Sequence, residues 1–170
     1  VQALINTAQA NGYEPQILSN VEKVNKKQKT VLVKKVIDRF GDDLSGMTFA
    51  LWGLSFKPGT DDVREATSLV VASELIDRGA KIKAYDSQAT EEFKRTIGDE
   101  YLGSIEFTDR RYDAINGSDA LILITEWKEF RNPDLDLLKE KMNQAIIFDG
   151  RNIYDKKIEN KGFELYQIGC

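Results

Sequence analysis

The sequence predicts an α/β protein in which a long helix precedes a doubly wound, mostly parallel sheet. From Met47 onward, short apolar runs alternate with segments whose apolar residues recur at helical spacing. That alternation is typical of strands joined by crossover helices. The run Ala120–Ile124 is apolar without alternation, as expected for a strand buried on both faces. These observations favour a Rossmann-like arrangement.

The first 43 residues are predicted to be helical. Val1 to about Asn11 forms a short helix, and Gly12–Pro15 interrupts the chain, with Pro15 suited to the first turn of a new helix. One long helix, at about 15–40, then follows. A single stripe of that helix carries Val21, Val24, Gln28, Val31, Leu32 and Val36. A helix of this length often packs against a second copy, so residues 1–43 are interpreted as linking and dimerisation helices, with the α/β domain at 44–170.

The domain begins with a strand at Met47–Trp52, whose last four residues are apolar. A loop leads from it to a helix at Ala66–Arg78, which has apolar residues at helical spacing. Gly79 is expected at the C-terminus of that helix, because glycine accepts a left-handed backbone. The next strand, Ala80–Tyr85, ends before Asp86.

The remaining elements follow the same alternation. Polar segments of helical character are separated by short apolar runs that are bounded by polar residues. In order, they are a helix at Thr90–Tyr101, a strand at Ile105–Phe107, a helix at Asp109–Asn116, the strand Ala120–Ile124, a helix at Asp134–Met142, and strands at Ala145–Phe148 and Phe163–Ile168.

The overall charge gives no reason to expect nucleic acid as a partner. The net charge is -4 over 170 residues, whereas nucleic-acid binding requires a basic face. No apolar run approaches the roughly 20 residues of a membrane span, and the N-terminus does not resemble a signal peptide. A cytoplasmic protein with a small-molecule ligand is therefore expected.

The chain has no histidine and one cysteine, Cys170. Ser-His-Asp and Cys-His catalytic sets, histidine-ligated zinc and thiolate metal clusters are thereby excluded. Cys170 has no base near it in the sequence and is interpreted as a bystander. We expect no metal site and no complete catalytic set within this chain.

The candidate ligand site starts at the loop Gly53–Arg64. In parallel sheets such a loop lies at the carboxyl ends of the strands, where ligands bind. It fits neither a GxGxxG fingerprint nor a P-loop, since Pro58 follows Lys57. Lys57 precedes a turn at Pro58-Gly59 and is predicted to bind an anion, with phosphate as the main candidate. Asp62 and Glu65 are interpreted as an N-cap and its partner.

Two further strand ends add candidates. Asp86 is interpreted as a turn-former rather than as the acid that binds a ribose hydroxyl. Trp127, in Thr125-Glu126-Trp127, is equally consistent with core packing and with a stacking platform. Arg151 follows Asp149 and the flexible Gly150, and it is expected to converge with Lys57 on the same sheet edge.

Three motifs resemble the UDP-glucose 6-dehydrogenase family. Gly53-Leu-Ser-Phe-Lys-Pro-Gly-Thr-Asp-Asp-Val-Arg-Glu-Ala is similar to the signature of the carboxy-terminal, UDP-binding domain of that family. Thr125-Glu126-Trp127 and Phe148-Asp-Gly-Arg-Asn-Ile-Tyr resemble two further signatures, and the helical residues from Val1 to Gln28 resemble its central linking region. The resemblance covers essentially the whole chain.

The resemblance implies a fragment of an enzyme that oxidises UDP-glucose to UDP-glucuronate with two NAD. Phe56, Lys57 and Arg151 match positions that contact the UDP-sugar, and Arg64 matches an arginine that reaches NAD. The NAD domain and catalytic cysteine of the family are not matched, so this fragment is expected to be inactive alone. The long helix implies a homodimer.

Two alternatives stay open from the sequence. The parent could be another nucleotide-sugar dehydrogenase, of the UDP-N-acetylmannosamine or GDP-mannose type, since related enzymes share looser versions of these motifs. A dimerisation module without a ligand is the second alternative.

Overall fold

The structure, a computed structural model, describes residues 1–169. Cys170, the expected bystander, lies outside the described residues. Six strands form one sheet in the order β3-β2-β1-β4-β5-β6, and every neighbouring pair is parallel. The strands are β1 (Thr48–Trp52), β2 (Lys81–Tyr85), β3 (Ile105–Phe107), β4 (Ala120–Leu123), β5 (Ile146–Asp149) and β6 (Glu164–Gln167). This order is that of a doubly wound, Rossmann-like domain, so the predicted fold class is confirmed.

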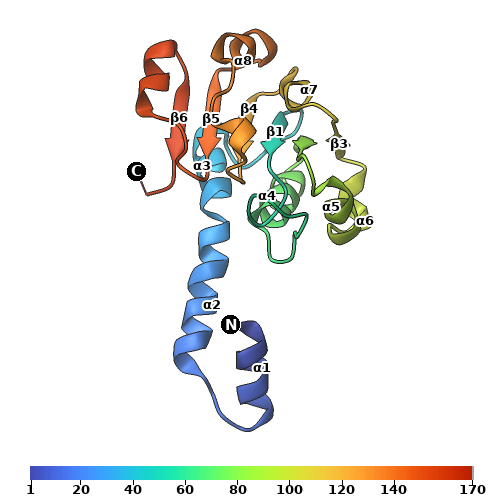
Figure 1. Cartoon of the computed structure of the whole chain (residues 1–170), viewed down its shortest axis with the longest axis vertical. Helices are drawn as coiled ribbons and strands as arrows, with labels where there is room; N and C mark the ends of the chain where they lie inside the picture. Colours follow the sequence, from blue (N-terminus) through green and yellow to red (C-terminus); the bar gives the residue numbers. More distant parts are fainter. Residues whose placement is uncertain (170) are drawn as a thin grey trace.

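Helices cover both faces of the sheet (Figure 1). Those of the domain are α3 (Val31–Phe40), α4 (Thr67–Ile76), α5 (Thr90–Thr96), α6 (Asp99–Leu102), α7 (Arg111–Ile115) and α8 (Leu135–Lys141), with 3₁₀ turns η1 (Lys128–Phe130) and η2 (Lys156–Lys161). The predicted helix at Thr90–Tyr101 is divided into α5 and α6. Neither 3₁₀ turn was predicted, since three to six residues are too few for a periodic pattern.

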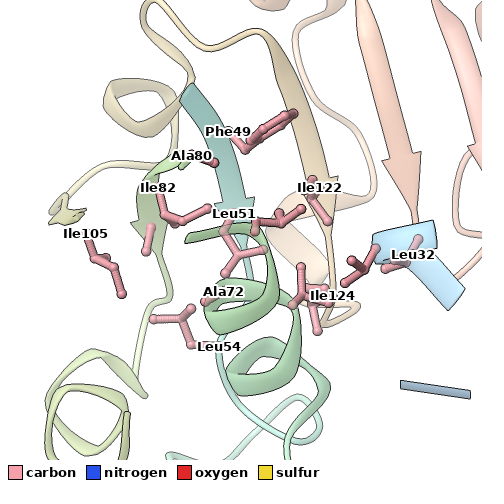
Figure 2. Packing of buried hydrophobic residues seen from close by; sticks show 14 of the residues in the cluster. Leu32, Phe49, Leu51, Leu54, Ala72, Ala80, Ile82, Ile105, Ile122 and Ile124 are labelled. Carbon is pink, nitrogen blue, oxygen red and sulfur yellow. The ribbon is translucent and has the colours of Figure 1, made fainter. Parts of the chain in front are cut away.

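The alternation of side chains along β1 divides the core into two layers. Phe49 and Leu51 point to the layer that contains residues of α3, α4 and α5, whereas Ala50 and Trp52 point to the layer with α7 and α8. Figure 2 shows the first layer, with residues of β1, β2 and β4 meeting those of α4, and Leu32 of α3 beside them. Burial on both faces is the reason that the central strands read as continuous apolar runs.

The predicted long helix consists of two consecutive helices, α2 (Gln16–Lys29) and α3. At Thr30, between them, both the N–H and the side-chain hydroxyl donate to the carbonyl of Lys27, which interrupts the α-helical pattern. The second of these helices, α3, is part of the core, with Leu32, Val33 and Val36 buried. None of the residues of α2 is buried. α2 therefore extends away from the sheet as a rod (Figure 1).

The short helix α1 (Gln2–Ala10) lies beside the outer part of α2. The side-chain amide of Gln2 donates to Glu22 at 2.9 Å, which joins the two helices. Among the helices of residues 1–169, none has the length and apolar content that a membrane crossing requires.

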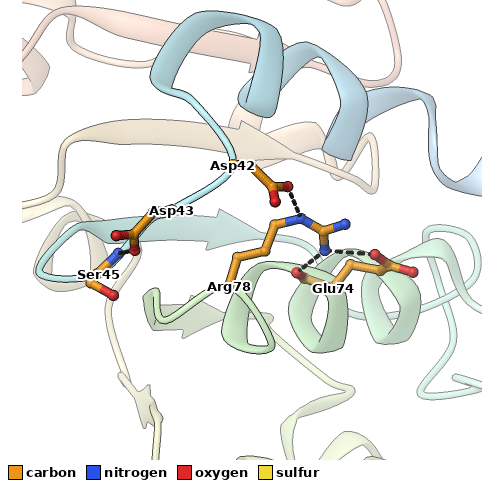
Figure 3. Close-up of polar contacts among 5 residues, drawn as sticks. All are labelled: Asp42, Asp43, Ser45, Glu74 and Arg78. Carbon is orange, nitrogen blue, oxygen red and sulfur yellow. Dashed lines mark hydrogen bonds and ion pairs between the residues drawn. The ribbon is translucent and has the colours of Figure 1, made fainter.

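An arginine fastens the segment after α3 to α4 (Figure 3). The Arg78 guanidinium donates to Asp42 at 2.9 Å and to Glu74 at 2.7 Å. Gly79, at the predicted helix end with φ 90°, leaves room for Ser45, whose Oγ would lie 2.5 Å from an added Cβ. The division at 43/44 stays a prediction, and α3 on its N-terminal side packs in the same core as the sheet.

Candidate functional site

The carboxylate of Asp86, just after β2, anchors the base of the loop that follows β1. Asp86 is buried, and its Oδ2 accepts hydrogen bonds from the N–H of Leu54 at 2.7 Å and of Ser55 at 3.2 Å. The same oxygen accepts from the indole N–H of Trp127 at 3.0 Å. Its Oδ1 accepts from two backbone N–H groups of the following turn, each at 2.9 Å. The carboxylate is fully engaged by protein donors, which supports its interpretation as a turn-former.

Gly53 and Thr125 bring the loops after β1 and β4 into direct contact. Gly53 has φ 91°, and a Cβ at this position would lie 2.5 Å from the Cβ of Thr125. The hydroxyl of Thr125 donates to the carbonyl of Ser55 at 2.6 Å. Two of the sequence motifs are therefore packed in direct contact, because a side chain at position 53 would overlap Thr125.

Beyond this base, the loop forms an exposed tip. The Phe56 N–H donates to the carbonyl of Asp62 at 2.8 Å, which closes the tip, and Phe56 is 54% exposed. Lys57 is exposed, and within residues 1–169 no hydrogen bond or ion pair involves its ammonium group. The role of Lys57 in binding an anion stays a prediction.

Arg64 and Glu65 form ion pairs with other side chains, and neither of them caps the N-terminus of α4. The Arg64 guanidinium, 85% exposed, lies 2.7 Å from Asp62, whose pKa the hydrogen bond from Arg64 lowers to about 2. Glu65, with φ 58°, pairs with Lys29 of α2 at 2.6 Å. The predicted capping role of Asp62 and Glu65 is wrong, because α4 starts later, after Ala66, and has no side-chain cap.

At the end of β5, Asp149 fixes the backbone that carries Arg151. The buried Asp149 carboxylate accepts from the N–H groups of Arg151 at 3.1 Å and Tyr154 at 2.9 Å. The side chain of Arg151 places Nε 2.6 Å from Oε2 of Glu126, at ion-pair distance but without the alignment of a hydrogen bond. Its Nη2 lies 3.4 Å from the carbonyl of Phe56.

Two neighbouring cavities meet at Arg151. The larger, of about 750 Å³, lies between the linking helices and the sheet edge and is lined by Phe56, Arg151 and polar residues of α2. The smaller, of about 480 Å³, is lined by Glu126, Arg131 and Arg151 among others. In the described part of the chain, Lys57 and Arg64 line neither of these two cavities.

The structure thus brings Phe56 and Arg151 together and places Lys57 on the outer tip of the same loop. The sequence analysis did not predict that Glu126 pairs with Arg151, although the position of Glu126 just after β4 indicated the same edge of the sheet. It also missed the polar wall that α2 gives the larger cavity, which comprises Glu22, Asn25, Gln28 and Lys29. Of these four residues, the sequence analysis had named only Gln28 on a helix face, as part of the apolar stripe.

The sequence is similar to known nucleotide-sugar dehydrogenases. Residues 50–156 match the model of the UDP-glucose/GDP-mannose dehydrogenase family, UDP binding domain. The chain is 40% identical over 171 aligned residues to a UDP-glucose 6-dehydrogenase of Pseudomonas aeruginosa, covering 99% of this chain and 38% of that protein. It is 37% identical to the UDP-glucose 6-dehydrogenase YwqF of Bacillus subtilis, covering 98% of this chain and 37% of the relative.

A solved structure supports the same likeness in three dimensions. A UDP-glucose dehydrogenase from the archaeon Pyrobaculum islandicum superposes with a TM-score of 0.76 at 28% identity, covering 97% of this chain and 34% of that one. The chain therefore spans somewhat more than a third of the length of the relatives that it matches.

Proposed function

Because this chain belongs to the UDP-glucose/GDP-mannose dehydrogenase family through the UDP binding domain, we propose that it is the UDP-sugar-binding part of a UDP-glucose 6-dehydrogenase. The observation that carries the proposal is the meeting of Arg151 and Phe56 at the larger cavity. A guanidinium fork suits phosphate oxygens, and an exposed aromatic ring offers a face to a base or sugar. Lys57, on the outer tip of the same loop, lines neither cavity, and it is proposed to add a second cation for the diphosphate when the ligand is bound.

The proposed parent oxidises UDP-glucose to UDP-glucuronate. Its two NAD each accept one hydride, and they are held mainly by parts of the parent that this chain does not match. Arg64 is proposed to reach NAD from this side, because its side chain is 85% exposed even though it is paired with Asp62. The chain by itself is proposed to have no dehydrogenase activity.

The linking helices are proposed to form a homodimer. Ile17, Val21 and Val24 of α2 are exposed and lie on one side of the helix, with Ile17 exposed to 80%. Burying such a stripe against a second copy would remove apolar surface from water.

Titration of UDP into the intact parent protein tests the proposed site. Arg151→Ala and Lys57→Ala are each expected to weaken UDP binding, Arg151→Ala by about 10- to 100-fold, because each removes a charge-assisted hydrogen bond. Lys81→Ala is the matched control, since Lys81 is an exposed lysine at the opposite, amino-terminal edge of the sheet. Isothermal titration calorimetry gives the affinities, and unchanged affinity in both site variants would contradict the assignment.

A further inference from the structure

Glu126 projects from a backbone that is fixed on both sides. Its neighbour Thr125 is buried and bonded to the Ser55 carbonyl at 2.6 Å. The indole of its other neighbour, Trp127, donates to Asp86 at 3.0 Å. A carboxylate between two such anchors has little freedom to follow a moving partner.

Arg151 also starts from a fixed backbone. Its N–H is bonded to Asp149, and the next residue, Asn152, has φ 52° and exchanges two hydrogen bonds with the backbone of Ile168, at 2.9 and 3.0 Å. A left-handed residue other than glycine is kept in place by such contacts. The freedom that remains is therefore in the long side chain of Arg151, which has several rotatable bonds.

The contact between the two side chains restricts that freedom. Glu126 Oε2 lies 2.6 Å from Nε of Arg151, and the side chains are only 31% and 38% exposed. The carboxylate oxygen has almost no contact with solvent and no hydrogen-bond donor within residues 1–169, so Arg151 is the group that faces it. The carboxylate lies against Nε of the guanidinium and Nη2 lies 3.4 Å from the Phe56 carbonyl, whereas Arg151 as a residue lines both cavities.

We propose that Glu126 is a positioning residue, which holds Arg151 at the junction of the two cavities so that its terminal nitrogens meet the diphosphate of a UDP-sugar. The inference rests on the proposed function. A negative charge beside the arginine reduces its attraction for an anion, but a guanidinium already held in the bound orientation avoids the entropy of ordering on binding. The geometry favours orientation, because both backbones are fixed before any ligand arrives.

A double-mutant cycle with UDP as the probe tests the proposal in the intact parent protein. Glu126→Ala is expected to weaken UDP binding about fivefold to tenfold, the size expected for one rotamer-rich side chain that must be ordered on binding. Glu126→Ala is expected to have no further effect when Arg151→Ala is already present, because the two act through one contact. Glu126→Gln, which keeps the length of the side chain but removes its charge, is expected to weaken binding as Glu126→Ala does, because the contact is an ion pair without the alignment of a hydrogen bond. Glu140→Ala, at an exposed glutamate on α8, is the control.

The outcomes distinguish failure of the positioning role of Glu126 from failure of the proposed UDP site. Stronger UDP binding by Glu126→Ala would overturn the proposal, since Glu126 would then compete with the ligand. Equal weakening in the presence and absence of Arg151→Ala would also overturn it, because a general loss of structure acts in both backgrounds. If Arg151→Ala itself leaves UDP affinity unchanged, the proposed UDP site falls and the inference falls with it.

Discussion

At the scale of single residues, Gly53 is the point where the site can least change. Its backbone has φ 91°, and the space above it is filled by Thr125. Gly59, in the same loop, has φ 81° but nothing within 4 Å of an added Cβ. A substitution at Gly59 therefore reports the cost of a left-handed backbone alone, whereas a substitution at Gly53 adds the clash with Thr125.

We predict that Gly59→Ala destabilises the fold by about 1 kcal/mol, the cost of a left-handed alanine. Gly53→Ala should cost about 3 kcal/mol, because overpacking against Thr125 adds to the same backbone cost. Chemical unfolding of both variants measures the difference in free energy. Equal losses would mean that the loops after β1 and β4 separate easily.

Asp62 gives the tip of the loop a dependence on pH. Its pKa is lowered from 3.8 to about 2 by the hydrogen bond from Arg64. Because the pKa is depressed in the folded state, the ion pair stabilises the tip above pH about 4, and this stabilisation is lost as the pH falls towards 2. An NMR titration of the Asp62 carboxyl should find a low midpoint, which Arg64→Ala should return towards the ordinary value.

The sequence predicted that Phe56, Lys57 and Arg151 follow strand ends at one edge of the sheet, but it did not predict which of these residues meet. Arg151 was expected to converge with Lys57, but the loops after β1 and β5, which flank β4, bring it to the backbone carbonyl of Phe56. Glu65 was misread because a left-handed conformation at a glutamate leaves no trace in the sequence. Its partner, Lys29, lies 36 residues earlier on a helix whose direction relative to the loop only the fold determines.

At the scale of elements, the linking helices divide into a buried and an exposed half. α3 is held by the core, whereas Ile17 and Val24 of α2 remain open. The sequence stripe is continuous through both halves, so it could not show where one packing partner ends and another begins. The interruption at Thr30 involves local hydrogen bonds from its hydroxyl and N–H to the carbonyl of Lys27. The spacing of apolar residues does not predict it.

We predict that Ile17→Glu together with Val24→Glu converts a dimer of the parent protein to monomers. Two buried carboxylates without partners would oppose the apolar contact that α2 is proposed to make. Sedimentation velocity measures the change in mass. Lys23→Glu is the control, because Lys23 is exposed on another side of α2, and a parent that is monomeric before mutation would contradict the dimer.

At the scale of the whole molecule, strand order assembles the site. β1, β4 and β5 are consecutive neighbours in a parallel sheet, so the loops after them meet at one edge. The alternating pattern of the sequence was sufficient to predict this convergence. The two cavities were not predictable, because the larger one requires α1 and α2 to lie beside that edge.

We predict that UDP raises the unfolding temperature of this chain and that NAD does not. Ligand that binds only the folded state stabilises it by about 2.7 kcal/mol at 100 times its dissociation constant. For a chain of 170 residues that is a rise of roughly 5 to 10 °C. Differential scanning fluorimetry measures both shifts, and a rise with NAD alone would place the cofactor site on this chain.

The central position of β1 has a consequence for the order of folding. β1 is synthesised before the other five strands of this sheet, and Phe49 is registered with Ala120, 71 residues further along. Such distant pairing slows folding, and an unpaired apolar strand is prone to aggregation while it waits. During translation, Phe49–Trp52 therefore remains without its partner on the β4 side until Ala120–Leu123 has left the ribosome, and this interval is when chaperones would matter most.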